Sequence, residues 1–206
     1  MLLTVTTLHT YYPWVFWAYL GLTLLLAGAG VGWVVALRFR GDLTTYDAVV
    51  ASLLWCYVVT LLYFTVIGRF AHTEYRAELD PFASWREVFS EDGRSKLPDL
   101  LVNLALMAPV AFLFAELASG NKRRAERDEP GIPPGRFRRH ERRPAVYSVM
   151  ISLCFSLLIE CLQYVSRTGT FEIDDIINNL AGAIVSAVVW KIWDTVRKKI
   201  VSNTDY

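Results

Sequence analysis

Residue types that build metal sites and covalent cross-links are scarce in this sequence of 206 residues, which contains three cysteines and three histidines. Cys56, Cys154 and Cys161 all lie within apolar runs, so we interpret them as small buried apolar residues and expect no disulfide framework. The histidines lie far apart and outside those runs, which argues against a histidine-rich zinc site. We therefore predict no metal and no cofactor.

Other functional signatures are also missing. The sequence has no phosphate-cradling glycine loop, no nucleophile elbow, no CxxC motif and no internal repeat. Its net charge of +1 gives no general reason to expect a nucleic-acid partner. Residues 1–12 contain neither Lys nor Arg and are followed by no small-residue cleavage pattern, so a cleaved signal peptide is not expected.

Long apolar runs are abundant, since 54% of the residues are hydrophobic and 14% are aromatic. Five runs are nearly free of charge and about as long as the roughly 20 residues that cross a bilayer as a helix. We predict a single domain over 1–206 that is all-α, a polytopic transmembrane helical bundle with short interfacial helices. The predicted spans are 14–37, 48–67, 97–117, 145–165 and 173–193.

The connecting segments carry their own predictions. Ser84 to Glu87 has the form of a capping box, which would start a short interfacial helix that Gly93 stops. Pro109 should kink the third span, and Glu116 should reach the headgroups. We expect 119–144 to be a flexible basic loop and 194–206 to lie along the membrane surface. The glycines of the first span, Gly28, Gly30 and Gly32, favour close helix packing.

The distribution of Lys and Arg predicts the orientation. With the N-terminus outside, fifteen basic residues fall on the inner side and six on the outer side. Because basic residues are enriched in cytoplasmic segments, we predict that the N-terminus is outside and the C-terminus is cytoplasmic.

Polar residues interrupt the last two spans at helical spacing. Ser152, Ser156, Glu160, Gln163 and Arg167 fall on one helical face, and Asp175, Asn179, Gly182 and Ser186 fall on another. A tight turn at 168–170 would bring the two polar faces together. Ionisable side chains within a span cost about 2.5–3.5 kcal/mol on insertion scales, so they rarely face lipid.

The predicted orientation places a set of polar residues within and at the ends of the spans in the outer half of the membrane. We predict one shared polar pocket that opens outward, formed by Arg69, Asn103, Glu160, Gln163, Arg167, Asp174, Asp175 and Asn179. Simpler structural roles stay open for most of them. Asp174 or Asp175 would serve as a helix cap, the arginines would reach headgroups, and the asparagines would bond neighbouring helices. Glu160 is the hardest to explain in this way.

These residues resemble the VanZ-like family of bacterial membrane proteins. The likeness rests on Glu160-x-x-Gln163, on Arg167 in the turn, and on Asp175-x-x-x-Asn179-x-x-Gly182 with Asp174 beside it. Gly68-Arg69, Pro81-Phe82, and Asn103 with Pro109 fit as well, so the likeness extends over roughly 48–190. Ala111 and Ser186 stand where the family often has glycine.

The family is named for resistance to glycopeptide antibiotics, especially lipid-tailed teicoplanin. The resemblance implies a bacterial cell-envelope protein whose pocket recognises an amphiphile, either such an antibiotic or a lipid-linked envelope precursor. An alternative is a membrane enzyme acting on a lipid-linked substrate, with Glu160 and Asp175 as candidate catalytic residues and divalent-cation help from Asp174, Asp175 and Asn179. A lipid transporter or translocator has less support. Membrane lipids are the other expected partners, and the sequence leaves the oligomeric state open.

Overall fold

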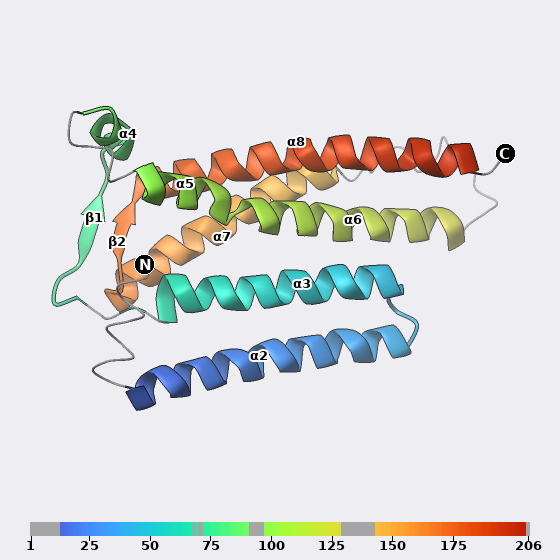
Figure 1. The fold of residues 1–206 in the computed structure, drawn as a ribbon, viewed down its shortest axis with the longest axis horizontal. Coiled ribbons are helices and arrows are strands. Elements are labelled where there is room, and N and C mark those ends of the chain that lie inside the picture. The colour runs from blue at the N-terminus through green and yellow to red at the C-terminus, as the bar shows by residue number, and fades with distance from the viewer. Residues whose placement is uncertain (1–12, 68, 70–71, 91–96, 129–142, 205–206) are drawn as a thin grey trace.

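The protein is a bundle of long helices with a two-stranded sheet at one end (Figure 1). The structure, a computed structural model, describes residues 13–67, 69, 72–90, 97–128 and 143–204. Five helical segments within these ranges are long and apolar enough to cross a membrane, in the order predicted from the sequence. The predicted all-α polytopic bundle is therefore confirmed.

The elements follow one another in the order α2 (Pro13–Phe39), α3 (Thr45–Leu62), the π-helical turn η1 (Tyr63–Ile67), β1 (Arg76–Glu78), α4 (Ala83–Val88), α5 (Leu97–Leu106), α6 (Ala108–Asp128), α7 (Pro144–Ser166), β2 (Thr170–Glu172) and α8 (Ile173–Thr204). The strands pair in parallel, with Ala77 opposite Phe171. This sheet was not predicted from the sequence.

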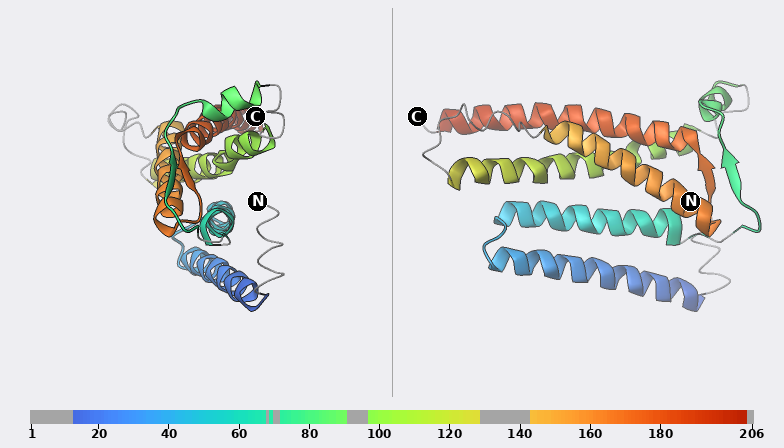
Figure 2. Two further views of the ribbon diagram at one scale, coloured as in Figure 1. Left: turned by 90° about the vertical axis from the view of Figure 1, so that its left-hand side faces the viewer. Right: turned by 180° about the vertical axis from the view of Figure 1, so that it is seen from behind.

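Helix α8 is the central element. It packs against α5, α6 and α7, whereas α3 packs against α6 and α2 lies at the edge beside α3 (Figures 1 and 2). The hydrophobic core forms where these helices meet, and it consists of Leu61, Met107, Val110, Ala111, Ile159 and Ala183. The core thus draws on α3, α6, α7 and α8, and it leaves α2 peripheral.

Pro109 separates α5 from α6, as the sequence predicts. The helix is interrupted at Met107, because proline lacks the N–H that would continue the backbone ladder. Side chains from other helices satisfy carbonyl groups beside the break. The hydroxyl of Tyr57 donates to the Leu106 carbonyl at 2.8 Å, and that of Ser186 donates to the Ala108 carbonyl at 2.6 Å. The kink therefore ties the third span to α3 and α8.

Glycine permits close contact at specific positions only. A Cβ on Gly182 of α8 would overlap the Leu104 carbonyl oxygen of α5, and one on Gly30 of α2 would overlap the Trp55 ring of α3. A Cβ on Gly28 or Gly32 would meet nothing within 4 Å. The prediction that all three glycines of the first span serve packing is thus wrong for two of them, which lie away from α3.

Three further predictions need correction. Residues 119–128 continue α6 instead of starting a flexible loop, since this stretch is rich in good helix formers; residues 129–142 lie outside the described ranges. Residues 194–204 continue α8 without a break instead of turning along the membrane surface. Cys154 and Cys161 are exposed and Cys56 is half-buried. A spanning helix is apolar on its lipid-facing side too, so an apolar run does not identify the buried face.

Candidate functional site

The polar residues of α7 and α8 form two buried stripes that face each other. Ser152, Ser156, Glu160 and Gln163 are each at most 5% exposed, and Asn179 and Ser186 of α8 are also buried. The Asn179 amide nitrogen donates to the Ser156 hydroxyl at 2.9 Å. The helical spacing seen in the sequence therefore corresponds to the buried faces of these two helices.

Helix α5 adds a third contributor to the same region. The amide nitrogen of Asn103 donates to a carboxylate oxygen of Asp175 in the first turn of α8. Two turns further along α8, Gly182 lies against the backbone of Leu104. This close approach of α5 and α8 brings the amide of Asn103 to the carboxylate, so the glycine supports the site indirectly.

Glu160 and Gln163 connect α7 to its neighbours at the strand end of the bundle. The Glu160 carboxylate accepts a hydrogen bond from the backbone N–H of Glu172 in β2 at 3.1 Å. The amide nitrogen of Gln163 donates to the Thr65 carbonyl in η1 at 2.9 Å. A π-helical turn departs from the regular backbone ladder, and here the Gln163 amide satisfies one of its carbonyl groups.

Arg69 follows η1 and brings a positive charge to this end. Its charge acts electrostatically on both Glu160 and Asp175. Its Nε donates to the Phe64 carbonyl over a long 3.4 Å, and in the part of the chain that the structure describes it makes no ion pair within 4 Å. We call Arg69, Asn103, Glu160, Gln163, Asp175 and Asn179 the strand-end polar cluster.

Among the described residues, two buried oxygen atoms have no hydrogen-bond partner: the amide oxygen of Asn179 in the cluster and the hydroxyl of Ser152, two turns away from Glu160 on α7. Both residues are buried. Buried polar atoms are hydrogen-bonded in the large majority of cases, so each unpartnered atom marks a place for a water molecule or a ligand group. The cluster thus keeps hydrogen-bonding capacity that the described residues do not use.

Asp174 takes a different role from the rest of the predicted site. Its carboxylate oxygens accept hydrogen bonds from the backbone N–H groups of Phe82 at 2.5 Å and of Ser84 at 2.7 Å. It therefore caps α4 from another helix. The predicted capping box is wrong, because α4 begins at Ala83 and the residue before it, Phe82, makes no side-chain cap. Beside this contact, the Trp85 indole donates to the Asn178 amide oxygen at 2.9 Å.

The use of Asp174 as a cap removes it from the predicted divalent-cation set. Both of its oxygens bind backbone N–H groups of α4, whereas Asp175 is hydrogen-bonded by Asn103 on α5. Within the described ranges, no group of three or more His, Cys, Asp or Glu side chains could hold a metal ion.

Arg167 also lies apart from the cluster. It caps the C-terminus of α7, and its guanidinium lies over the ring of Tyr75, 4.3 Å from the ring centroid. Its nitrogens donate to the Tyr75 hydroxyl at 3.2 Å and to the Thr73 carbonyl at 3.4 Å. The side-chain partners of Arg167 therefore lie on the segment of Thr73 and Tyr75 and not among the residues of the cluster.

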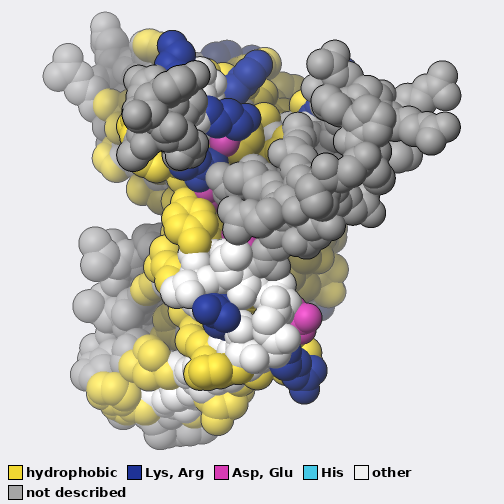
Figure 3. Space-filling model, turned by 90° about the vertical axis from the view of Figure 1, so that its right-hand side faces the viewer, with side chains coloured by type: hydrophobic (Ala, Val, Ile, Leu, Met, Phe, Trp, Pro, Cys, Tyr) yellow, Lys and Arg dark blue, Asp and Glu magenta, His cyan; other side chains and the backbone are white. Residues whose placement is uncertain are grey.

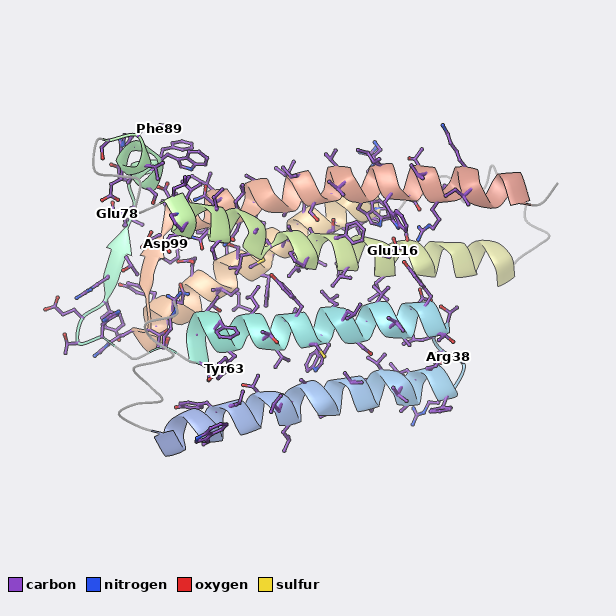
Figure 4. The ribbon with its side chains drawn as sticks, viewed as in Figure 1. Arg38, Tyr63, Glu78, Phe89, Asp99 and Glu116 are labelled. Atoms are coloured by element: carbon purple, nitrogen blue, oxygen red, sulfur yellow. The ribbon has the colours of Figure 1, made fainter. Side chains whose placement is uncertain are left out.

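A second buried polar network was missed in the sequence. Glu116 of α6 is 1% exposed and points toward α8 in the half of the bundle away from the strands (Figure 4). Its carboxylate pairs with Arg197 and accepts hydrogen bonds from the Trp190 indole at 2.8 Å and the Tyr46 hydroxyl at 3.0 Å. The prediction that Glu116 reaches the headgroups is wrong. Glu116 and Arg197 are 81 residues apart, so no local sequence pattern identifies this pair.

Two cavities in the described part of the chain are lined by residues outside the cluster. One of about 270 Å³ lies between α7 and the strands, and one of about 490 Å³ lies among α2, α3 and α6. Both are lined by apolar side chains except for Gly30 in the larger one. Glu160, Gln163 and Asn179 are themselves buried between neighbouring elements.

Comparison with known proteins places the chain in a family. The family model described as VanZ/LLP1 matches residues 48–194, which include every element from η1 to β2 and most of α3 and α8. Searches of curated proteins and of solved structures return no match. Because the family match extends over more than half of the chain and five helices are able to span a membrane, the chain is a multi-pass membrane protein of the VanZ/LLP1 family.

Proposed function

We propose that this protein recognises an amphiphile of the bacterial cell envelope through the strand-end polar cluster. The ligand would be a lipid-tailed glycopeptide antibiotic or a lipid-linked envelope precursor, and its binding would lower glycopeptide susceptibility. One observation carries the proposal. Among the described residues, Arg69, two carboxyl groups and an unpartnered amide oxygen lie together at the strand end of the bundle.

The composition of the cluster fits a polar or anionic headgroup. Arg69 offers the donors of a guanidinium, and its charge acts on Glu160 and Asp175 without forming a close ion pair in the described ranges. A guanidinium binds carboxylate and phosphate groups through two parallel hydrogen bonds. The carboxyl groups would orient Arg69 toward the headgroup, while the hydrocarbon tail would remain in the bilayer.

The proposed opening of the site is outward. Lys and Arg side chains are visible at the end of the bundle opposite the strands, where α2 and α8 finish (Figure 3). Basic residues are enriched on the cytoplasmic side, which supports an outer location for the strand end. An outer site would meet an antibiotic before it reaches the cytoplasm and would meet envelope precursors where they are used.

A second candidate is an enzyme acting on a lipid-linked substrate. Glu160 and Asp175 interact electrostatically but have different hydrogen-bond donors, a backbone N–H for Glu160 and the amide of Asn103 for Asp175. Two carboxyl groups in distinct environments are able to divide acid and base roles. Turnover of a labelled lipid-linked precursor by purified protein would favour this candidate, whereas binding without turnover favours recognition.

The replacement Glu160→Gln tests the proposal in cells. Glutamine still accepts a hydrogen bond from the backbone of Glu172 but carries no charge, so we expect loss of the effect on susceptibility to lipid-tailed glycopeptides at near-parental membrane abundance. Glu116→Gln is the matched control, because it neutralises a buried carboxylate outside the cluster. It should lower thermal stability and retain the phenotype in the protein that remains. Parental behaviour of Glu160→Gln would refute the charged recognition site.

A further inference from the structure

An apolar groove lies on the side of α7 away from the strand-end polar cluster. Its volume is about 270 Å³, and it is lined by Ala77, Cys161, Tyr164, Val165 and Phe171. Strand β2 separates it from the cluster. The backbone N–H of Glu172 faces Glu160, while the preceding residue, Phe171, lines the groove. Apart from the Cys161 thiol and the Tyr164 hydroxyl, the lining is aliphatic and aromatic, so the groove fits hydrocarbon.

A cationic side chain and a series of aromatic rings stand at one end of the groove. The Arg167 guanidinium lies 4.3 Å from the centroid of the Tyr75 ring, and that ring lies 5.2 Å from Tyr164. Tyr164 in turn lies 6.5 Å from Phe171. Tyrosine rings are typical of the membrane–water interface, where the end of a spanning helix lies. The Arg167 guanidinium, the tyrosine rings and the apolar groove are therefore adjacent on the protein surface.

The backbone at Arg167 is unusual. Its φ angle of 57° is left-handed at the C-terminal cap of α7, a position that glycine commonly occupies. A side chain with a Cβ is disfavoured in this conformation. The hydrogen bonds of its guanidinium are long, at 3.2 and 3.4 Å. Arg167 thus occupies a strained backbone position, and its guanidinium forms only weak hydrogen bonds within the protein. Both features indicate that the guanidinium binds a group from outside the protein.

We propose that Arg167 and this groove form a binding site for an anionic glycerophospholipid. One acyl chain lies in the groove, and the headgroup phosphate binds the guanidinium. Phosphate is a preferred partner of the planar arginine fork, and the lining has the chemistry of an acyl chain. The site is distinct from the strand-end polar cluster, so it holds whether or not the cluster recognises an envelope amphiphile.

Spin-labelled lipids test this site directly. The protein is reconstituted in phosphatidylcholine vesicles that carry a small fraction of phosphatidylglycerol labelled on its acyl chain, and the motionally restricted fraction is compared with that of labelled phosphatidylcholine. Arg167→Gly removes the guanidinium and relieves the left-handed backbone, so thermal stability should not fall. The preference for phosphatidylglycerol should fall about fivefold, which corresponds to one basic group near an anionic lipid.

Matched variants distinguish binding at this site from non-specific attraction of anionic lipid to basic residues on the protein surface. Arg76→Gln removes an equal charge from an exposed position on β1 and should keep the preference. Ala77→Trp fills the groove and should reduce the restricted fraction, whereas Val188→Trp on the exposed side of α8 should not. Val165→Trp replaces Ala77→Trp if the latter lowers thermal stability. The proposal would be overturned if Arg167→Gly kept the preference for phosphatidylglycerol, or if Arg76→Gln lost as much of it. It would also be overturned if the restricted lipid fraction stayed the same when the groove was filled.

Discussion

Asp174 shows how one side chain acquires its role from a partner far away in sequence. A helix-start acid beside Asp175 fits a local cap or a pocket ligand equally well in the sequence. In the structure its carboxylate instead caps α4 through Phe82 and Ser84, about 90 residues earlier in the chain. Phe82 has a left-handed backbone with φ 63°, and its bonded N–H helps to hold this conformation.

This assignment predicts the outcome of Asp174→Ala. Two backbone donors in partly buried hydrogen bonds would lose a charged acceptor, at a cost of about 1–3 kcal/mol each in the free energy of unfolding. Hydrogen exchange should become faster over residues 82–89, and the thermal midpoint should fall. Ser84→Ala is the control, since the Ser84 hydroxyl forms no cap. Greater disruption of α4 by Ser84→Ala than by Asp174→Ala would restore the capping-box interpretation.

The sequence predicts some of the site residues but not all of them, and individual residues show why. Ser156, Glu160 and Asn179 repeat at helical spacing, which predicts a shared face without knowledge of the fold. Arg167 fits the same spacing, but the left-handed turn at its own backbone directs it toward Tyr75. Glu116 meets Arg197 from 81 residues away, so no local pattern identifies that pair.

At the scale of elements, composition predicts the helices and misses the sheet. Long runs that are nearly free of charge define all five spans, and Pro109 defines the break between α5 and α6. The strands are three residues long, which is too short for a period-two pattern to appear. Their pairing of Arg76 with Thr170 depends on α7 and α8 bringing β2 beside β1.

Helices α5 and α8 cross so closely at Gly182 that adding a single methyl group there should destabilise the protein. In Gly182→Ala the new Cβ would overlap the Leu104 carbonyl, which belongs to the backbone and has little freedom to move. We expect destabilisation of about 1–3 kcal/mol, measured as a lower thermal midpoint in detergent. Gly32→Ala adds the same methyl group to α2 where nothing lies within 4 Å, and it should be nearly neutral. Equal midpoints for the two variants would contradict the described helix contact.

For the whole molecule, the orientation prediction concerns which side of the membrane holds the strand end. After replacement of Cys56, Cys154 and Cys161, single cysteines are placed at Thr170 and Gly131. Because fifteen basic residues lie on the predicted inner side and six on the outer side, Thr170→Cys should react with an impermeant maleimide in intact cells and Gly131→Cys should not. Both should react after permeabilisation. The reverse pattern would place the strand-end polar cluster on the cytoplasmic side.

Binding by the purified protein tests the account most directly. The binding of teicoplanin and of a labelled lipid-linked precursor is measured on protein in nanodiscs, with a glycopeptide that lacks the lipid tail as the reference ligand. We predict saturable binding of at least one tailed ligand by the parent protein. Glu160→Gln should bind it at least tenfold more weakly, which corresponds to a loss of about 1.4 kcal/mol of binding free energy. Glu116→Gln should bind it with the parental affinity. If neither tailed ligand binds, or if Glu160→Gln binds as tightly as the parent, the strand-end polar cluster is not the recognition site.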